Sequence, residues 1–294
     1  MTDLIARRRE LLGPNVSTFY DEPVHIVRGE GVYVSDEHGY RYLEGMAGLW
    51  CAHLGFSEAR LVDAAREQME RLPTYHLFGG KSHRPAIELA ERLLAIAPVP
   101  MSKVLFTSSG SEANDTAIKL VRYYHHAVGK PDKRKIIALE RAYHGATVAG
   151  ASLGGLPHVH RDFGLPLEGF LHAGCPHYYR HAQPGETEET FAARLAAELE
   201  RLILREGPDT VAAFIAEPLM GAGGVIMPPA TYFKQVQAVL QKHDVLLIAD
   251  EVITGFGRTG EMFGCQTFDI QPDLITIAKG LSAGYMPIGG VLIA

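Results

Sequence analysis

Cysteine is scarce in this sequence. Only Cys51, Cys175 and Cys265 occur among its 294 residues, and they lie far apart. Their odd number and wide spacing argue against a framework of disulfide bonds. We therefore expect the protein to work in the reducing environment of the cytoplasm.

Long apolar runs and blocks of basic residues are missing as well. The longest apolar runs, such as Val245–Ala249, are far too short to cross a bilayer. The start, Met1–Arg9, has neither the apolar core nor the cleavage site of a signal peptide. The formal net charge is −6, and the lack of a long basic run argues against nucleic acid as the main partner. We expect a globular protein with no membrane segment and no nucleic-acid partner.

The first sixty residues have a pattern of their own. Val24–Val27 and Gly31–Val34 alternate weakly between apolar and polar residues, and Asp36–Gly39 is typical of a hairpin turn. A helix is expected over 57–71, where apolar residues recur at helical spacing. This part of the chain is predicted to be a small, β-rich segment followed by a helix.

Beyond Pro85, short apolar runs alternate with longer amphipathic stretches. Runs without polar alternation are typical of strands that are buried on both faces, and such strands are usually parallel. Helical spacing of apolar residues is evident over 191–204 and 232–240. The alternation predicts an α/β fold, with a mostly parallel sheet flanked by helices. The expected strands are Lys103–Phe106, Ile136–Leu139, Val211–Ala216, Val245–Ala249, Leu274–Ala278 and Val291–Ala294.

Polar, ionisable or small residues follow almost every expected strand. Ligands of such sheets bind at the carboxyl ends of the strands, so the functional site is expected there. The segments concerned are Thr107–Asn114, Arg141–Gly145, Glu217–Pro218, Asp250–Val252 and Lys279–Gly280.

Two interpretations are open for the segment Ser109–Glu112. Ser109 and Glu112 have the spacing of a capping box at the start of a helix. Alternatively, the segment binds phosphate: Gly110 lets a ligand approach the backbone, the first amides of the helix point outward, and Ser109 and Ser111 add hydroxyl groups.

The other candidate side chains also have a structural and a functional interpretation. Asp250 is either a solvated strand end or a carboxylate held beside a cationic ring nitrogen. Lys279 either extends past a strand end into solvent or presents a desolvated amine that attacks a carbonyl group. Tyr143 and His144 are turn and core residues, or one ring lies flat on a planar cofactor. Trp50, the single tryptophan, belongs to the core or to the substrate pocket.

Two further patterns predict no site. His158, His160, His172 and His177 are not joined by a second cluster that would complete a zinc site, so no metal is expected. Gly255–Gly260 is rich in glycine but does not open a long helix after a strand, which makes it a poor dinucleotide-binding motif.

Taken together, the strand ends supply a phosphate cradle, an aromatic ring, a carboxylate and a lysine, which are the groups that pyridoxal 5'-phosphate needs. At this point the sequence resembles the class III, or omega, aminotransferases. The segments that carry the resemblance are Ser108–Asn114, Ala142–Gly145, Glu217–Pro218, Ala249–Val252, Gly255–Gly260 and Pro272–Gly280.

The resemblance covers about the whole chain and implies a fold, a reaction and an assembly. It implies fold type I of the pyridoxal-phosphate-dependent transferases, with residues 1–60 as the N-terminal segment of the small domain and 61–294 as the cofactor-binding large domain. It implies a homodimer with shared active sites. The reaction implied is transfer of an amino group from an amine or omega-amino acid donor to a keto-acid acceptor such as pyruvate.

The resemblance also implies a role for each matching residue. Lys279 corresponds to the lysine that forms a Schiff base with the cofactor and moves a proton, and Asp250 to the partner of the pyridine nitrogen. The remaining cofactor contacts are implied for Ser109, Gly110, Ser111, Tyr143, His144, Glu217 and Val252. Trp50 and Tyr143 are implied to line the substrate site.

One departure from the family's pattern concerns length. Members typically continue for well over a hundred residues beyond the lysine, and that stretch carries residues that bind the substrate carboxylate and the partner's phosphate. We therefore expect the large domain to be incomplete at its C-terminus. An aminomutase, a decarboxylating transaminase or a non-catalytic fragment are the alternative functions that the sequence leaves open.

Overall fold

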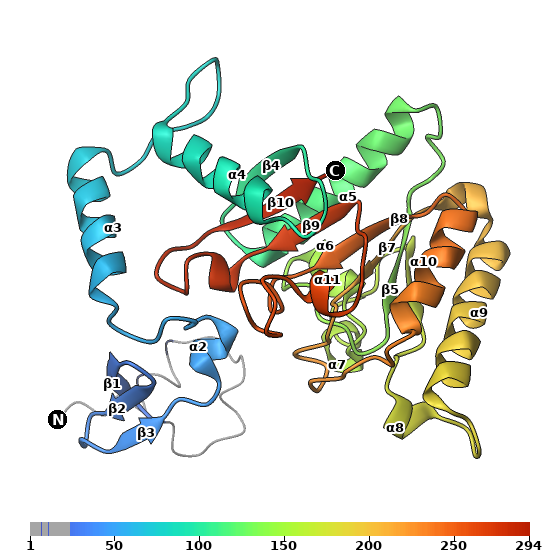
Figure 1. Cartoon of the computed structure of the whole chain (residues 1–294), viewed down its shortest axis with the longest axis horizontal. Coiled ribbons are helices and arrows are strands. Elements are labelled where there is room, and N and C mark those ends of the chain that lie inside the picture. Colours follow the sequence, from blue (N-terminus) through green and yellow to red (C-terminus); the bar gives the residue numbers. More distant parts are fainter. Residues whose placement is uncertain (1–6, 8–10, 12–23) are drawn as a thin grey trace.

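A seven-stranded sheet forms the centre of the protein in the computed structural model, which describes residues 7, 11 and 24–294. The strand order is β4-β10-β9-β8-β7-β5-β6 (Figure 1). The bounds are β4 Lys103–Thr107, β5 Lys135–Leu139, β6 Phe170–Ala173, β7 Val211–Ala216, β8 Leu246–Asp250, β9 Leu274–Ile277 and β10 Gly289–Ile293.

The sheet is mostly parallel, as the sequence predicts. Strands β6, β5, β7, β8 and β9 pair in parallel, whereas β10 pairs antiparallel with both β9 and β4. All six expected strands are present, with bounds that differ by at most two residues at either end. The sequence analysis missed β6, because Phe170–Ala173 is a short edge strand that contains His172 and lacks a continuous apolar run.

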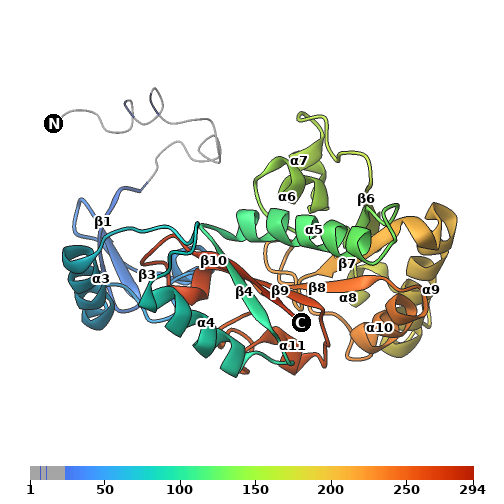
Figure 2. The ribbon, with the colours of Figure 1, turned by 90° about the horizontal axis from the view of Figure 1, so that it is seen from above.

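Helices cover both faces of the sheet (Figure 2). Successive residues of β5 pack against helices on opposite faces of the sheet. Ile137 packs with α9 and α10, whereas Ile136 packs with α5. The α/β architecture expected from the sequence is thereby confirmed. The helices of this part are α4 Arg84–Ile96, α5 Gly110–Ala127, α6 Val148–Leu153, α7 Pro157–His160, α8 Tyr178–His181, α9 Glu188–Glu206, α10 Tyr232–Lys242 and α11 Gly264–Thr267, with the 3-10 turns η2 Pro208–Thr210 and η3 Lys279–Leu281.

The N-terminal part forms a separate antiparallel sheet of three strands, followed by α2 and α3. The hairpin turn at Asp36–Gly39 is present between β2 and β3, and the helix expected over 57–71 is present as α3. No residue of α3 is buried. The bounds are β1 Ile26–Glu30, β2 Tyr33–Asp36, β3 Arg41–Leu43, α2 Ala47–Trp50 and α3 Ala59–Arg71.

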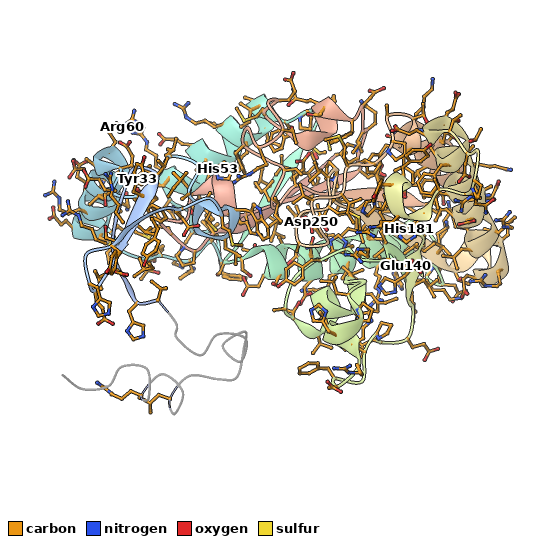
Figure 3. The ribbon with its side chains drawn as sticks, turned by 90° about the horizontal axis from the view of Figure 1, so that it is seen from below. Tyr33, His53, Arg60, Glu140, His181 and Asp250 are labelled. Carbon is orange, nitrogen blue, oxygen red and sulfur yellow. The ribbon has the colours of Figure 1, made fainter. Side chains whose placement is uncertain are left out.

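Among the residues that the structure describes, no helix is long and apolar enough to cross a membrane. The segment Met1–Arg9, on which the expectation about a signal peptide rests, lies outside the described residues except for Arg7. In Figure 3, Asp250 lies between the N-terminal part, marked by Tyr33 and His53, and the region of Glu140 and His181.

Candidate active site

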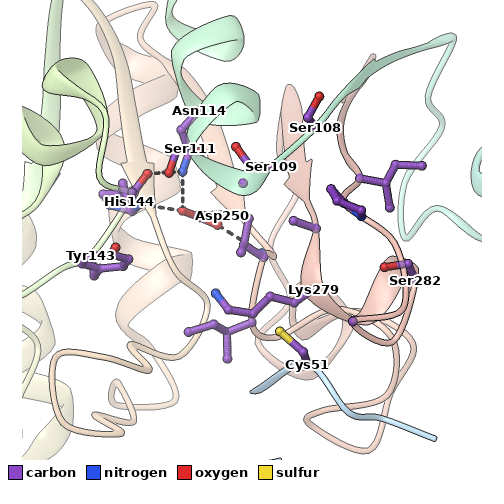
Figure 4. Close-up of a pocket in the computed structure, with 18 of the residues that line it drawn as sticks. Cys51, Ser108, Ser109, Ser111, Asn114, Tyr143, His144, Asp250, Lys279 and Ser282 are labelled. Atoms are coloured by element: carbon purple, nitrogen blue, oxygen red, sulfur yellow. Dashed lines mark hydrogen bonds and ion pairs between the residues drawn. The ribbon is translucent and has the colours of Figure 1, made fainter. Parts of the chain in front are cut away.

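A cavity of about 390 Å³ lies at the carboxyl ends of the central strands (Figure 4). A volume of this size is typical of small-molecule sites. The cavity brings together nine of the ten residues that the sequence singles out, which come from segments far apart in the chain. These nine are Ser109, Gly110, Ser111, Tyr143, His144, Glu217, Asp250, Val252 and Lys279.

Asp250 ends β8 and is the most enclosed acid of the cavity, with 3% of its surface exposed. Its Oδ2 accepts hydrogen bonds from His144 Nδ1 at 2.7 Å and from Asn114 Nδ2 at 2.8 Å, and its Oδ1 accepts one from Val252 N at 3.1 Å. Burial raises the pKa of a carboxyl group, but the bonds from His144 and Asn114 outweigh it and the pKa of Asp250 is lowered. The carboxylate is therefore ionised and held in a fixed orientation.

Asn114 is a member of this network that the sequence analysis did not assign to the site. Its Nδ2 also donates to the carbonyl oxygen of His144 at 2.8 Å, so it ties α5 to the loop after β5. A signal was present in the sequence, because Asn114 is a polar residue beside Ala113 and Ala117 on the buried face of a helix. Within the described part of the chain, Asn114 Oδ1 and His144 Nε2 are buried without a hydrogen-bond partner.

Glu217 follows β7 and is also buried. Its Oε1 accepts from Tyr143 N at 3.1 Å and its Oε2 from Gly221 N at 2.8 Å. Burial raises the pKa of Glu217 to about 7, and the nearby charge of Asp250 adds to the rise. Glu217 and Asp250 thus line one cavity with opposite pKa shifts, which is characteristic of functional sites.

The start of α5 closes one side of the cavity. Ser109 Oγ accepts from Glu112 N at 3.2 Å, and Glu112 Oε2 accepts from Ser108 N at 2.7 Å, so the segment does cap the helix. The cap leaves the first amides of the helix, those of Gly110 and Ser111, without an intrahelical acceptor. The capping interpretation and the anion-binding interpretation are therefore compatible.

Gly110 is required by packing as well as by access. A Cβ atom on Gly110 would lie 3.0 Å from both methyl groups of Val252. The start of α5 therefore packs directly against Val252, two residues beyond Asp250. A larger residue at 110 would push α5 away from the end of β8.

Lys279 follows β9 and Ala278, and its side chain points into the cavity (Figure 4). Its φ of +38° is unusual for a residue with a side chain. Strain of this kind concentrates at functional positions. The next residue is held close to the N-terminal part, because a Cβ atom on Gly280 would lie 2.8 Å from the ring of His53.

Trp50 is the predicted residue that does not line this cavity. It lines an adjacent cavity of about 280 Å³, and Ile253 is common to both cavities. The neighbour of Trp50, Cys51, does line the first cavity. Cys51 belongs to the segment Gly48–Cys51, which the family resemblance implies to be part of the pocket. Sequence analysis did not assign Ile253 or Ser282 to the site, because nothing in their local pattern distinguishes them from packing residues.

The segment that carries Trp50 has an unusual backbone. Ala47, Gly48, Leu49 and Trp50 all have positive φ, between 49° and 64°, which makes α2 a left-handed turn. Residues with side chains lose roughly 1–2 kcal/mol each in this conformation. Arg258 Nη2 donates to the carbonyl oxygen of Trp50 at 3.1 Å and so connects the turn to the glycine-rich loop.

The histidines of the β6 region bond to the backbone. His172 Nε2 lies 2.9 Å from the carbonyl oxygen of Gly154, and His160 Nε2 lies 2.9 Å from that of Ala151. Within residues 24–294 and at positions 7 and 11, no three His, Cys, Asp or Glu side chains form a group suited to a metal ion.

The residues of the cavity fit pyridoxal 5'-phosphate. An ionised, buried carboxylate at Asp250 suits a protonated ring nitrogen, the free amides and hydroxyl groups at the start of α5 suit a phosphate, and Lys279 suits an aldehyde. Asn114 and His144, which also line the cavity, each retain one buried polar atom without a hydrogen-bond partner among the described residues.

Comparison with known proteins supports this fit. The model of the family "Aminotransferase class-III" matches residues 16–294. A gamma aminobutyrate transaminase 3 (chloroplastic) of Solanum lycopersicum is 58% identical over 274 residues, which are 93% of this chain and 53% of that protein. A vanillin aminotransferase of Capsicum frutescens is 57% identical over 274 residues, covering 93% of this chain and 60% of that protein.

Solved structures agree with the fold. The omega transaminase of Pseudomonas jessenii in complex with PMP has a TM-score of 0.97 and 59% identity, covering 99% of this chain and 65% of that one. An omega-aminotransferase of Paracoccus denitrificans has a TM-score of 0.95 and 46% identity, and the match covers 98% of this chain and 65% of that one. These likenesses confirm the expected fold type. The chain spans about half the length of the curated relatives that it matches.

Proposed function

The chain belongs to the class-III aminotransferase family, and on that premise we propose that it binds pyridoxal 5'-phosphate and takes part in amino-group transfer. The observation that carries the proposal is a single cavity shared by Lys279, the ionised carboxylate of Asp250 and the free amides at the start of α5. The omega transaminase from Pseudomonas jessenii, 59% identical, is described in complex with PMP.

When bound, the cofactor supplies an aldehyde that combines with amines and a ring that withdraws electrons from the substrate carbon. Asp250 accepts a hydrogen bond from the ring nitrogen and favours its protonated form, because the carboxylate is ionised and fixed by His144 and Asn114. Gly110 and Ser111 donate backbone N–H groups to the phosphate, and the hydroxyl groups of Ser109 and Ser111 add polar contacts.

Lys279 has two tasks in this proposal. Its Nζ would hold the cofactor through the aldehyde group, and its amine would move a proton at the substrate carbon. Tyr143, Val252 and Glu217 line the same cavity and would hold the ring of the cofactor. Enclosure by these residues limits access of water.

The proposed substrates are an amine or omega-amino acid donor and a keto-acid acceptor such as pyruvate, with Trp50 and Tyr143 at the substrate site. Support comes from the relatives, which are named gamma-aminobutyrate transaminase, vanillin aminotransferase and omega transaminase. Because the chain spans about half the length of these curated relatives, the full reaction is best measured on the product of the whole reading frame.

A homodimer with shared active sites is part of the proposal. It is supported by apolar side chains that the described chain leaves exposed around α3 and after it, among them Val62, Met69 and Phe78. We also propose that residues 1–60 belong to a small domain and 61–294 to the cofactor-binding domain. A cytoplasmic location is proposed from the scarcity of cysteine, although plant relatives are named chloroplastic or mitochondrial.

The proposal is tested by mixing the protein with pyridoxal 5'-phosphate, reducing with borohydride and mapping the labelled peptide. We expect the label on Lys279. The matched control is Lys279→Arg, which keeps the charge but cannot form the bond and should remain unlabelled. A label on a different lysine in the parent protein would refute the assignment.

A further inference from the structure

A second polar cavity, of about 510 Å³, lies apart from the active site and shares no lining residue with it. Four of its seven lining residues are basic. It is built from the loop after β5, the short helix α8 with the residue before it, and the loop after β7. Its lining residues are Arg141, His177, Arg180, His181, Gly223, Gly224 and Ile226. Figure 3 shows His181 on the opposite side of Asp250 from the N-terminal part.

The charge of this cavity is not compensated by the described part of the chain. No acidic residue lines it, and none of its four basic side chains has an ion pair within 4.0 Å among the described residues. The neighbouring Arg194 differs, because its guanidinium pairs with Glu186 at 2.8 Å and with Glu198 at 3.2 Å. Glu140, which precedes Arg141, makes no ion pair with the cluster.

Arg141 is held in place by the backbone. Its φ is +68°, and its Nε and Nη2 donate to the carbonyl oxygen of Gly223 at 3.2 and 2.8 Å. A Cβ atom on Gly223 would lie 2.4 Å from the carbonyl oxygen of Arg141, so only glycine fits there. These two bonds use two of the five N–H donors of the guanidinium and leave three for a ligand.

The four basic groups affect one another. The pKa of His177 is lowered, first by burial and then by the positive charges of His181, Arg180 and Arg141. Mutual repulsion of this kind is relieved when an anion binds between the groups. The cluster is thus arranged as anion-binding sites are, with a fixed guanidinium and further donors around an open space.

We propose that this cavity is a binding site for a phosphate group, carried either by free inorganic phosphate or by a small phosphate monoester. The fixed guanidinium of Arg141 and the side chains of Arg180, His177 and His181 bind its oxygen atoms. The site is independent of the cofactor's phosphate cradle at the start of α5, and the proposal does not rest on aminotransferase activity.

The test is calorimetric titration of the cofactor-loaded protein, freed of unbound cofactor, with inorganic phosphate at fixed ionic strength. Loading the protein first keeps the titrant out of the phosphate cradle of the active site. We expect saturable binding, and about tenfold weaker binding in Arg180→Gln and in His181→Gln, since each loses one contact to the oxyanion. Both side chains are exposed and make no hydrogen bond within the part of the chain that the structure describes, so these variants should keep the fold.

The matched control is Arg161→Gln, which removes the same charge from an exposed arginine on another segment and should bind phosphate as the parent does. A second arm uses glycerol 3-phosphate, and the tighter of the two ligands identifies the source of the phosphate group. Absence of saturable binding, equal affinity in all variants, or equally tight binding of succinate would overturn the proposal.

Discussion

The two sheets of this protein differ in how much of their apolar surface their own chain covers. Every residue of β7 is buried, because helices lie on both faces of the large sheet. In the N-terminal part, β3 is wholly exposed and α3 has no buried residue, although its apolar face is well formed. The large sheet is therefore stabilised within the described chain, whereas the N-terminal part presents apolar side chains that the described residues leave uncovered.

The largest expected difference between the two regions is in the loss of stability when a phenylalanine of each region is replaced by alanine. Phe214 on β7 is fully buried, whereas 81% of the surface of Phe78, between α3 and α4, is exposed. Phe214→Ala should lower the free energy of unfolding by about 3–5 kcal/mol, because it leaves a cavity in the core. Phe78→Ala should change it by no more than roughly 0.5 kcal/mol. Urea unfolding of both variants measures the difference.

Equal losses in the two variants would contradict the comparison. Such a result at low protein concentration would mean that Phe78 is covered within the chain. If the loss at Phe78 grew with protein concentration, it would point instead to cover from a second copy, as the proposed homodimer requires.

The candidate active site also draws on both regions, and a second pair of substitutions separates their contributions. Asp250→Asn should slow the spectral change that an amine causes in the cofactor-loaded protein by about 10²–10³-fold, because an amide cannot hold the ring nitrogen protonated. Cys51→Ser should change the rate only slightly, since Cys51 Sγ has a single long contact, 3.6 Å, to the carbonyl oxygen of Leu49.

Stopped-flow absorbance with one amine donor measures both rates. A near-normal rate in Asp250→Asn would mean that Asp250 has only a structural role. A loss in Cys51→Ser as large as that in Asp250→Asn would show that the N-terminal part takes part in the chemistry rather than in enclosure of the cavity.

The smallest expected effect is the pH dependence of folding stability. Glu217 at the large sheet and Asp36 in the N-terminal sheet should change stability with pH in opposite directions. Burial raises the pKa of Glu217 from 4.5 to about 7, so the folded protein binds a proton there that the unfolded chain has lost. Folding stability therefore falls as the pH rises from 4.5 to 7. The difference between these two pKa values corresponds to a change in stability on the order of 3 kcal/mol.

Replacement of Glu217 by glutamine should abolish this dependence. Without cofactor, the stability of Glu217→Gln should increase relative to that of the parent between about pH 5 and about pH 8. Urea unfolding at the two pH values checks this. A constant difference between the two proteins would show that Glu217 is ionised in the folded state throughout.

Asp36 of the N-terminal sheet is the counterpart with the opposite sign. Burial tends to raise its pKa, but hydrogen bonds from the Tyr42 hydroxyl group and from the amides of Tyr40 and His38 lower it overall. Its contribution to stability is present above the ordinary pKa of 3.8 and is lost as the pH falls through the lowered value. Asp36→Asn should therefore weaken the N-terminal sheet at neutral pH but not in strong acid.

Sequence patterns were sufficient to locate the buried strands of the large sheet, for a physical reason. Strands buried on both faces must be apolar throughout, so Val211–Ala216 and its parallel neighbours stand out from the amphipathic helices. The direction of β10 could not be predicted, because a buried antiparallel strand between two others has the same apolar run. Edge strand β6 has no such run and was missed.

Within the site, residues at strand ends were predictable and residues set by long-range contacts were not. Asp250 and Lys279 each follow an apolar strand, which marks them in the sequence. Asn114 lies in the site because α5 crosses the end of β8, and Trp50 lies in the adjacent cavity because a left-handed turn directs it there. No local pattern encodes either arrangement.

The position of β10 has a consequence for synthesis of the chain. Strand β4 is the edge strand at Lys103–Thr107, and its only neighbour in the described sheet is β10 at Gly289–Ile293. During translation at about 5–20 residues per second, β4 must wait on the order of 10–40 s for its partner to emerge. Throughout that interval the backbone N–H and C=O groups of β4 are unpaired and can form hydrogen bonds with a strand of a neighbouring nascent chain. The order in which this sheet is completed therefore makes β4 the element in greatest need of protection by a chaperone.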